Sequence, residues 1–283
     1  MPLSRDEIKD LMLKANEVRR WVIELTYRAK SGHPGGSLSA ADILTALYFK
    51  ILRVDPKNPR WEDRDRFVLS KGHAAPAYYA VLAMKGFFPK EELYTLRKVN
   101  SRLQGHPSLI TPGVDMATGS LGQGLSAAIG MALAARIDKK DYRVFVMLGD
   151  GECHEGNVWE GAMFASHHKL DNLIAIVDRN MIQLDGFTEE IVALESFSDK
   201  WRSFGWWVQS INGHDFNEIV RALKYAIEYK GRPSVIIART IKGKGVSYME
   251  NNPAYHGKPP KNEDEYRKAI EELEEERRRI MEM

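Results

Sequence analysis

Two short apolar runs, separated by a helix-like stretch, constrain the fold of this 283-residue chain more than any other feature. The runs cover residues 143–148 and 172–177, and the stretch between them covers about residues 157–168. Such runs have the length of strands, and their unbroken hydrophobicity is typical of parallel strands that are buried on both faces. The pattern therefore predicts a βαβ unit.

The same alternation of strands and helices extends along most of the chain. Further strands are expected at 66–70 and 234–239, and helical periodicity runs from residue 5 to about 30 and over 39–50, 77–85, 216–229 and 262–283. The glycines and proline of 31–36 are expected to separate the first two helices. We predict an α/β fold, a doubly wound and mostly parallel sheet with helices on both faces, over 1–260, followed by a charged C-terminal helix over 261–283.

The charge balance and the cysteine content exclude several classes of protein. With 41 Lys and Arg against 39 Asp and Glu, the formal charge is +2, which argues against nucleic acid as a partner. The apolar runs are far shorter than the roughly 20 residues of a membrane span, so no membrane insertion is expected. A single cysteine, Cys153, permits no internal disulfide, and the charged N-terminus does not look like a signal peptide. We therefore expect a cytoplasmic protein.

Oxygen-bearing side chains follow both apolar runs. Asp150 follows the first run and Asn180 follows the second. Because ligands of parallel sheets bind at the carboxyl ends of the strands, the two side chains are expected to lie together. Carboxylate and carboxamide oxygens suit Mg²⁺, with Ca²⁺ as the alternative. A Gly-Asp-Gly sequence alone indicates only a turn, and the downstream Asn180 is what favours a metal site.

Histidines and aromatic residues give two further signals. Five of the eight histidines adjoin a glycine, which favours loop positions where substrates are contacted; they are His33, His73, His106, His214 and His256. Each of them alone is better explained as a structural histidine. Four aromatic residues gather within seven positions, namely Trp201, Phe204, Trp206 and Trp207. They are expected to fill the domain's own core, with an oligomer interface as the alternative.

Six motifs in order along the chain identify a family resemblance. The segment from Gly149-Asp150-Gly151 to Asn180 resembles the motif that binds thiamine diphosphate. The other motifs resemble those of transketolase and read KSGHPGG at 30–36, SKGHAAP at 70–76, QGHPS at 104–108, TGSLGQG at 118–124 and IKGKGVSYMENNPAYHGKP at 241–259. The resemblance covers the N-terminal, diphosphate-binding part of transketolase, so the chain looks like the N-terminal subunit of a split transketolase.

The resemblance implies a cofactor and a role for each matching residue. Thiamine diphosphate would be held through Mg²⁺ by Asp150, Asn180 and the backbone carbonyl of Ile182. The residues implied around the cofactor are Lys71, His73, Gly119, Ser120, Leu121, Asp150, Gly151, Glu152, Asp178, Asn180, Lys242 and His256. Ser120 stands where many relatives have proline. The implied catalytic set is His33, His73, His106 and His256 near the donor sugar, with Glu155 and Glu160 linking two cofactor sites across a dimer.

The implied reaction is the transfer of a two-carbon ketol unit from a ketose phosphate to an aldose phosphate, as from xylulose 5-phosphate to ribose 5-phosphate in the pentose phosphate pathway. The glutamate that activates the cofactor belongs, in this family, to the pyrimidine-binding domain. The resemblance therefore implies an α₂β₂ heterotetramer with a C-terminal partner subunit. Three alternatives remain: a transketolase for an unusual sugar, a thiamine-dependent 2-oxo acid dehydrogenase α-subunit, and a non-catalytic scaffold.

Overall fold

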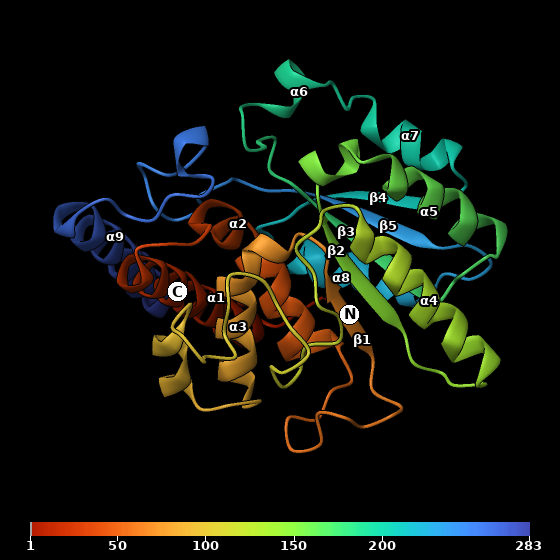
Figure 1. Cartoon of the computed structure of the whole chain (residues 1–283), viewed down its shortest axis with the longest axis horizontal. Helices are drawn as coiled ribbons and strands as arrows, with labels where there is room; N and C mark the ends of the chain where they lie inside the picture. Colours follow the sequence, from red (N-terminus) through yellow and green to blue (C-terminus); the bar gives the residue numbers. More distant parts are fainter. Residues whose placement is uncertain (1) are drawn as a thin grey trace.

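The computed structural model describes residues 2–283 and contains, within that range, one five-stranded sheet (Figure 1). The strands are β1 (Arg66–Leu69), β2 (Val144–Gly149), β3 (Leu173–Arg179), β4 (Trp207–Asn212) and β5 (Ser234–Arg239). Their order in the sheet is β1-β2-β3-β5-β4, and every neighbouring pair is parallel. The predicted parallel α/β fold is confirmed.

Helices alternate with the strands along the chain. The α-helices are α1 (Arg5–Ala29), α2 (Pro34–Ala46), α3 (Ala75–Lys85), α4 (Gln123–Ile137), α5 (Gly156–His167), α6 (Thr188–Ile191), α7 (Phe197–Ser203), α8 (Phe216–Glu228) and α9 (Glu263–Glu282). A π-helical turn covers Leu47–Ile51, and 3-10 turns cover Gly72–Ala74, Lys90–Thr95, Gly151–His154 and Pro253–Tyr255. Among the described residues, no helix combines the length and the hydrophobicity that crossing a membrane requires.

Each central strand contributes side chains to two hydrophobic cores. In β2, Phe145 and Met147 join the core shared with α1, α2, α3 and α8, whereas Val144, Val146 and Leu148 join the core shared with α4, α5 and α7. Because both faces of the sheet are covered, the residues of β2, β3 and β5 are buried, apart from Gly149 and Arg239 at the ends of β2 and β5. This double burial explains why the strands read as unbroken apolar runs in the sequence.

The first helix begins at a capping box and ends against the last helix. The Ser4 hydroxyl accepts the Glu7 N–H at 3.2 Å, and the Ser4 N–H donates to the Glu7 carboxylate at 2.8 Å. Apolar residues such as Leu11 and Val22 then face the core. Helix α9 packs along α1, as Figure 1 shows, and buries Leu273 there. The predicted charged C-terminal helix is thus a docked helix.

Two elements differ from the sequence-based expectation. Helix α2 begins at Pro34, not near residue 39, so that Gly35 and Gly36 lie in its first turn. Proline has no N–H to lose at this position, and its fixed φ suits the start of a helix. Strand β4 was not predicted. It lies at the edge of the sheet, where its residues are only half-buried and lack a continuous apolar run.

The aromatic cluster fills the core, as the favoured interpretation predicted. Trp201 and Trp206 are buried in the core beside α5, and the Trp206 indole N–H donates to the Ala162 carbonyl at 2.9 Å. Trp207 is half-buried and stacks on Tyr229 with ring centroids 4.6 Å apart. These aromatic side chains therefore stabilise the domain itself.

Candidate active site

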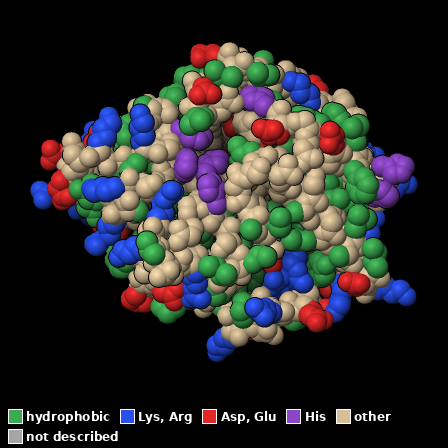
Figure 2. All heavy atoms as spheres, in the orientation of Figure 1, with side chains coloured by type: hydrophobic (Ala, Val, Ile, Leu, Met, Phe, Trp, Pro, Cys, Tyr) green, Lys and Arg blue, Asp and Glu red, His purple; other side chains and the backbone are tan. Residues whose placement is uncertain are grey.

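A cleft of about 380 Å³ opens at the carboxyl ends of β2 and β3. The strand register, in which Gly149 pairs with Asp178, brings the segments after both strands to this edge. Figure 2 shows histidine side chains gathered around a hollow in the molecular surface. Predicted residues that line the cleft are His33, Lys71, His73, His106, Gly119, Leu121, Asp150, Gly151, Glu152, Glu155, Asn180, Ile182, Lys242 and His256. One cleft thus collects residues from all six motifs.

The three predicted metal ligands present oxygen atoms in this cleft. The Asp150 carboxylate is fixed by the N–H groups of Gly151, at 2.8 Å, and Met181, at 2.7 Å. The Asn180 amide nitrogen donates to the Asp178 carboxylate at 3.1 Å. The Asn180 amide oxygen therefore points away from Asp178, and it accepts a hydrogen bond from the Ile182 N–H at 3.2 Å. Burial raises the pKa of Asp150, although Arg179 opposes this shift. The set consists of hard oxygen donors, which suits Mg²⁺.

Within residues 2–283, no three His, Cys, Asp or Glu side chains converge in the manner of a metal site. Any metal in the cleft would therefore depend on a mixed set: one carboxylate, one amide and one backbone carbonyl. Magnesium is usually held in this way, by one or two carboxylates with phosphate oxygens and water completing its shell. The donor set fits a metal that arrives together with a diphosphate.

Two buried lysines line the cleft. The Lys71 ammonium is paired with Asp178 and donates to the Gly36 carbonyl at 2.9 Å. The Lys242 ammonium donates to the Ile182 carbonyl at 2.7 Å and lies 2.7 Å from Nδ1 of His256. Burial, together with the Lys71 charge, lowers the pKa of Lys242 to about 7. An anion bound between the two lysines would relieve this repulsion.

Asp178 lies beneath the cleft and not in its lining. Its carboxylate is buried and accepts hydrogen bonds from Lys71, Ser39, Thr240 and the Asn180 amide. Burial opposes its ionisation, but the Lys71 ammonium and these hydrogen bonds hold the pKa of Asp178 below its usual value. Asp178 therefore holds Lys71 and Asn180 in place from beneath the cleft.

Four histidines surround the mouth of the cleft. The His33 ring lies 5.2 Å from His73, 6.5 Å from His106 and 5.7 Å from His256, measured between ring centroids. His33 is the residue preceding α2, and its buried Nδ1 has no hydrogen-bond partner within residues 2–283. Of the five glycine-flanked histidines, only His214 lies outside this cluster.

The four histidines are uncharged near neutral pH. Burial, with the charges of His106, Arg97 and Lys242, lowers the pKa of His33 to about 4. Burial and Lys242 lower the pKa of His256 to about 3. The pKa of His73 lies well below its usual value, and that of His106 is also lowered, in both cases mainly by burial. A neutral ring has one N–H donor and one nitrogen acceptor, although Nδ1 of His256 already accepts from Lys242, which leaves that ring only its Nε2–H donor for a ligand.

Glu152 joins two backbone segments of the cleft. Its buried carboxylate accepts the Gly149 N–H at 3.0 Å and the Gly122 N–H at 2.9 Å, and it also accepts the Ser70 hydroxyl. Gly119, in the same loop as Gly122, has φ +153°, and a Cβ there would lie 3.1 Å from the His106 ring. The 118–124 loop is thus held beside the cleft by Glu152 and approaches His106 closely through a glycine.

Some predicted residues lie elsewhere, and some lining residues were not predicted. Ser120 and Glu160 are exposed and do not line the cleft, whereas Glu155 is exposed but does line it. The additional lining residues are Gly149, His154, Gln183, Leu184 and Asp185. The His154 ring bonds Gln183 at 3.0 Å. For Gln183, Leu184 and Asp185, the only signal in the sequence was their proximity to Ile182. His154 does not adjoin a glycine, so the feature that drew attention to the other histidines was missing.

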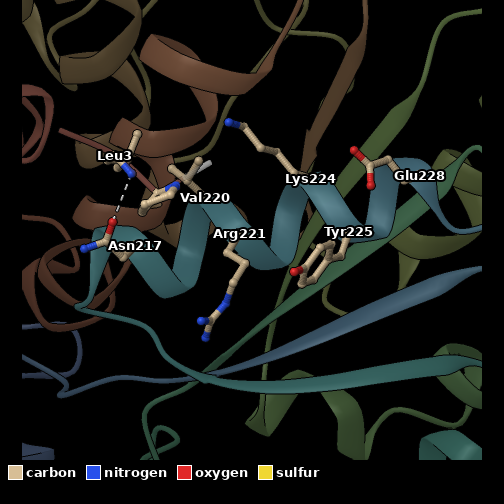
Figure 3. Close-up of a pocket in the computed structure, with 8 residues that line it drawn as sticks. Leu3, Asn217, Val220, Arg221, Lys224, Tyr225 and Glu228 are labelled. Carbon is tan, nitrogen blue, oxygen red and sulfur yellow. Dashed lines mark hydrogen bonds between the residues drawn. The ribbon is translucent and has the colours of Figure 1, made fainter.

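A second hollow, of about 320 Å³, lies along α8 and contains no predicted site residue (Figure 3). There the Leu3 N–H donates to the Asn217 side chain at 3.3 Å, and Arg221, Lys224 and Tyr225 project from the helix. The contact fastens the N-terminal segment to α8. Its charged lining residues are exposed and, within residues 2–283, no histidine lines it, so the cleft beside β2 and β3 is the better candidate for chemistry.

Comparisons with known proteins agree with this site. The family model for the transketolase thiamine diphosphate-binding domain matches residues 11–276. The chain is 50% identical to the 6-deoxy-6-sulfo-D-fructose transketolase subunit of a Clostridium species, over 94% of this chain and 97% of the relative. It is 46% identical to an apulose-4-phosphate transketolase subunit of Phocaeicola vulgatus, over 95% of each.

Full-length transketolases match over part of their length only. Human transketolase is 44% identical over 91% of this chain, which spans 41% of that protein. The solved transketolase of Campylobacter jejuni superposes with a TM-score of 0.87 at 34% identity, covering 96% of this chain and 45% of that one. The dehydrogenase alternative is therefore not supported. The chain belongs to the transketolase family of transferases, of which it represents the thiamine diphosphate-binding part.

Proposed function

We propose that this chain is the N-terminal subunit of a thiamine diphosphate- and Mg²⁺-dependent transketolase that transfers a two-carbon ketol unit between sugars. One observation carries the proposal. The oxygen atoms of Asp150, Asn180 and Ile182 share a cleft with two buried lysines and four neutral histidines. A scaffold protein has no physical need for such a set, because a buried lysine without an ion-pair partner, such as Lys242 among the described residues, destabilises a fold.

The cleft residues fit a metal-bound diphosphate. Asp150, Asn180 and the Ile182 carbonyl would hold Mg²⁺, and Lys71 and Lys242 would neutralise the phosphate oxygens. Gly151 leaves no room for a side chain, since a Cβ there would lie 2.8 Å from Cβ of Gln183. When bound, thiamine diphosphate supplies the nucleophilic carbon that cleaves the ketose carbon–carbon bond.

The histidines would act on the hydroxyl groups of the sugar. A neutral imidazole can accept a proton from a hydroxyl group of the sugar. It can also donate a hydrogen bond to an oxyanion that forms on the sugar during the reaction. His33 is placed for this role, because it lines the cleft and its ring lies among those of His73, His106 and His256. Burial keeps all four rings uncharged, so at neutral pH they would act as hydrogen-bond donors and acceptors toward the sugar hydroxyl groups.

A partner chain would complete the site. Exposed apolar side chains follow Asn180 along the chain beside the cleft, namely Met181, Leu184, Phe187, Ile191 and Val192. Such a patch next to a binding cleft is typical of a protein interface. We therefore propose a C-terminal subunit that carries the pyrimidine-binding domain and the activating glutamate, in an α₂β₂ complex.

The sugar substrates are the second part of the proposal. Xylulose 5-phosphate and ribose 5-phosphate are the donor and acceptor expected of a transketolase in the pentose phosphate pathway. Two relatives that match this chain nearly end to end are named for 6-deoxy-6-sulfo-D-fructose and apulose 4-phosphate. A specialised ketose is therefore the second candidate donor for this subunit.

Capture of the partner tests the proposal. The tagged chain is used to isolate complexes from extracts of its own cells with Mg²⁺ and thiamine diphosphate, and the complex is assayed with each of the three ketoses. Transfer from any one of them supports the function and identifies the donor. A complex that binds the cofactor but transfers from none of them would contradict the proposed donors, and absence of any bound partner would contradict the split enzyme.

Calorimetry on the same complex tests the metal assignment. Asp150→Asn should weaken binding of Mg²⁺-thiamine diphosphate at least roughly a hundredfold, because a metal ligand loses its charge. Asp185→Asn is the matched control, since Asp185 also lines the cleft but is exposed. Equal affinity of the two variants would refute the role of Asp150.

A further inference from the structure

His214 is the one glycine-flanked histidine that the cleft does not use. It follows β4 and lies between α2 and the segment after β5. Its Nδ1 lies 2.6 Å from the Asp42 carboxylate, and its Nε2 lies 2.8 Å from the backbone N–H of Ile241. Ile241 immediately precedes Lys242, one of the two buried lysines of the cleft.

The hydrogen bonds fix the tautomer of the ring. The Ile241 N–H can only donate, so Nε2 must be the acceptor and Nδ1 must carry the proton. That proton is donated to Asp42, which also forms a two-pronged ion pair with Arg19. Burial opposes the ionised form of Asp42, but the Arg19 guanidinium and the bond from His214 hold the pKa of Asp42 below its usual value.

The chain of contacts begins in the N-terminal helices and ends at Lys242. The side chains of Arg19, on α1, and Asp42, on α2, are only 4% and 6% exposed, so the ion pair is a rigid anchor. The Gly243 N–H also donates to the Gly35 carbonyl at 3.0 Å, which ties the same segment to the start of α2 a second time. The backbone on both sides of Lys242 is thus fixed to α2.

We propose that His214 is a positioning residue for Lys242. Through its two hydrogen bonds, His214 connects the rigid Arg19–Asp42 pair to the backbone of Ile241, and this backbone orients the Lys242 ammonium group toward the cleft. The inference rests on the proposed function, because the placement of Lys242 matters when the cleft holds the cofactor's diphosphate. His214 itself touches neither the cleft nor the ligand. Its effect is expected on cofactor affinity and not on the affinity for sugars.

Three variants of the complex test this role. His214→Leu removes both the donor and the acceptor, whereas His214→Gln retains one of each on a side chain of similar reach. His167→Leu is the control, because His167 is exposed at the end of α5. Calorimetry with Mg²⁺-thiamine diphosphate measures the affinity, and hydrogen exchange of the cofactor-free chain measures protection of the Ile241 amide.

The expected result is specific. His214→Leu should weaken cofactor affinity roughly tenfold and speed exchange at residues 241–243, with the KM for the donor sugar unchanged, because the hydrogen bonds of His214 to Asp42 and from the Ile241 N–H are both lost. His214→Gln should recover most of both losses. Unchanged affinity in His214→Leu, or equal losses in the two variants with a parallel fall in Tm, would overturn the inference. Failure of the unmodified complex to bind the cofactor would instead overturn the proposed function.

Discussion

Breaking the buried pair between Lys71 and Asp178 should destabilise the protein far more than breaking a surface pair. The two side chains are 1% and 0% exposed, with Lys71 in the lining of the cleft and Asp178 beneath it. Asp178→Asn leaves the Lys71 ammonium buried without a counter-charge. Lys71→Met leaves the Asp178 carboxylate with only its hydrogen bonds from Ser39, Thr240 and Asn180. Each change therefore isolates one buried charge.

The magnitude follows from this burial. Removing one partner of a buried ion pair costs about 3–5 kcal/mol, because the remaining charge keeps its desolvation penalty. The double variant removes both charges, so its loss should be smaller than the sum of the single losses by at least about 2 kcal/mol. The exposed pair of Lys90 and Glu17, 2.6 Å apart, is the control, and Lys90→Met should cost less than about 1 kcal/mol.

Urea unfolding of the cofactor-free chain at pH 7, followed by far-ultraviolet circular dichroism, measures these free energies. The pKa of Asp178 lies below its usual value, so the pair is ionised at pH 7, and its stabilisation is lost only as the pH falls through that lowered pKa. Additive single losses, or single losses no larger than that of Lys90→Met, would refute the assignment of Lys71 and Asp178 as a coupled buried pair.

Three other perturbations have defined outcomes. Gly151→Ala should destabilise the chain by about 1–3 kcal/mol in urea unfolding, because the new Cβ meets Gln183 at 2.8 Å; an unchanged midpoint would show that the loop yields freely. His33→Asn should reduce the fall in Tm that occurs when the pH is lowered from 6.5 to 4. In this pH range the unfolded state binds a proton on His33, whereas the folded state, in which the pKa of His33 is about 4, does not. An identical fall in Tm for the variant and the original chain would contradict this. Trp206→Ala should cost about 3–5 kcal/mol by removing a buried ring and its bond to Ala162, and a loss below about 1 kcal/mol would contradict its place in the core.

The sequence predicted four of the five strands, including the edge strand β1, and missed the other edge strand, β4. Buried parallel strands need apolar residues on both faces, so β2, β3 and β5 left a clear signal near their true bounds. Strand β4 is half-buried at the edge and carries polar residues such as Gln209, so hydrophobicity did not reveal it. The start of α2 was misplaced because Pro34 and the following glycines are compatible with both a loop and a first helical turn.

Motif order predicted which segments meet in the cleft but not how each side chain is used. Asp178 was expected beside the cofactor, yet its carboxylate points beneath the cleft to Lys71. His214 adjoins a glycine, as His33 does, so the sequence did not distinguish the two residues. In the structure His214 instead lies between α2 and the segment after β5, where it contacts Asp42 and Ile241. Gln183 and His154 both line the cleft and contact each other. They lie 29 positions apart in the sequence, so no local sequence pattern predicts this contact.

Reconstitution from separately purified chains tests the central claim most directly. This chain, its pyrimidine-binding partner and the mixture of both are assayed for two-carbon transfer with Mg²⁺ and thiamine diphosphate, using the donor sugar that the captured complex accepts. The mixture should turn over, and either chain by itself should be slower by roughly 10²–10⁴-fold, because in the proposed complex the activating glutamate lies on the partner and the histidine cluster on this chain. Turnover by this chain alone at the rate of the mixture would contradict the split active site.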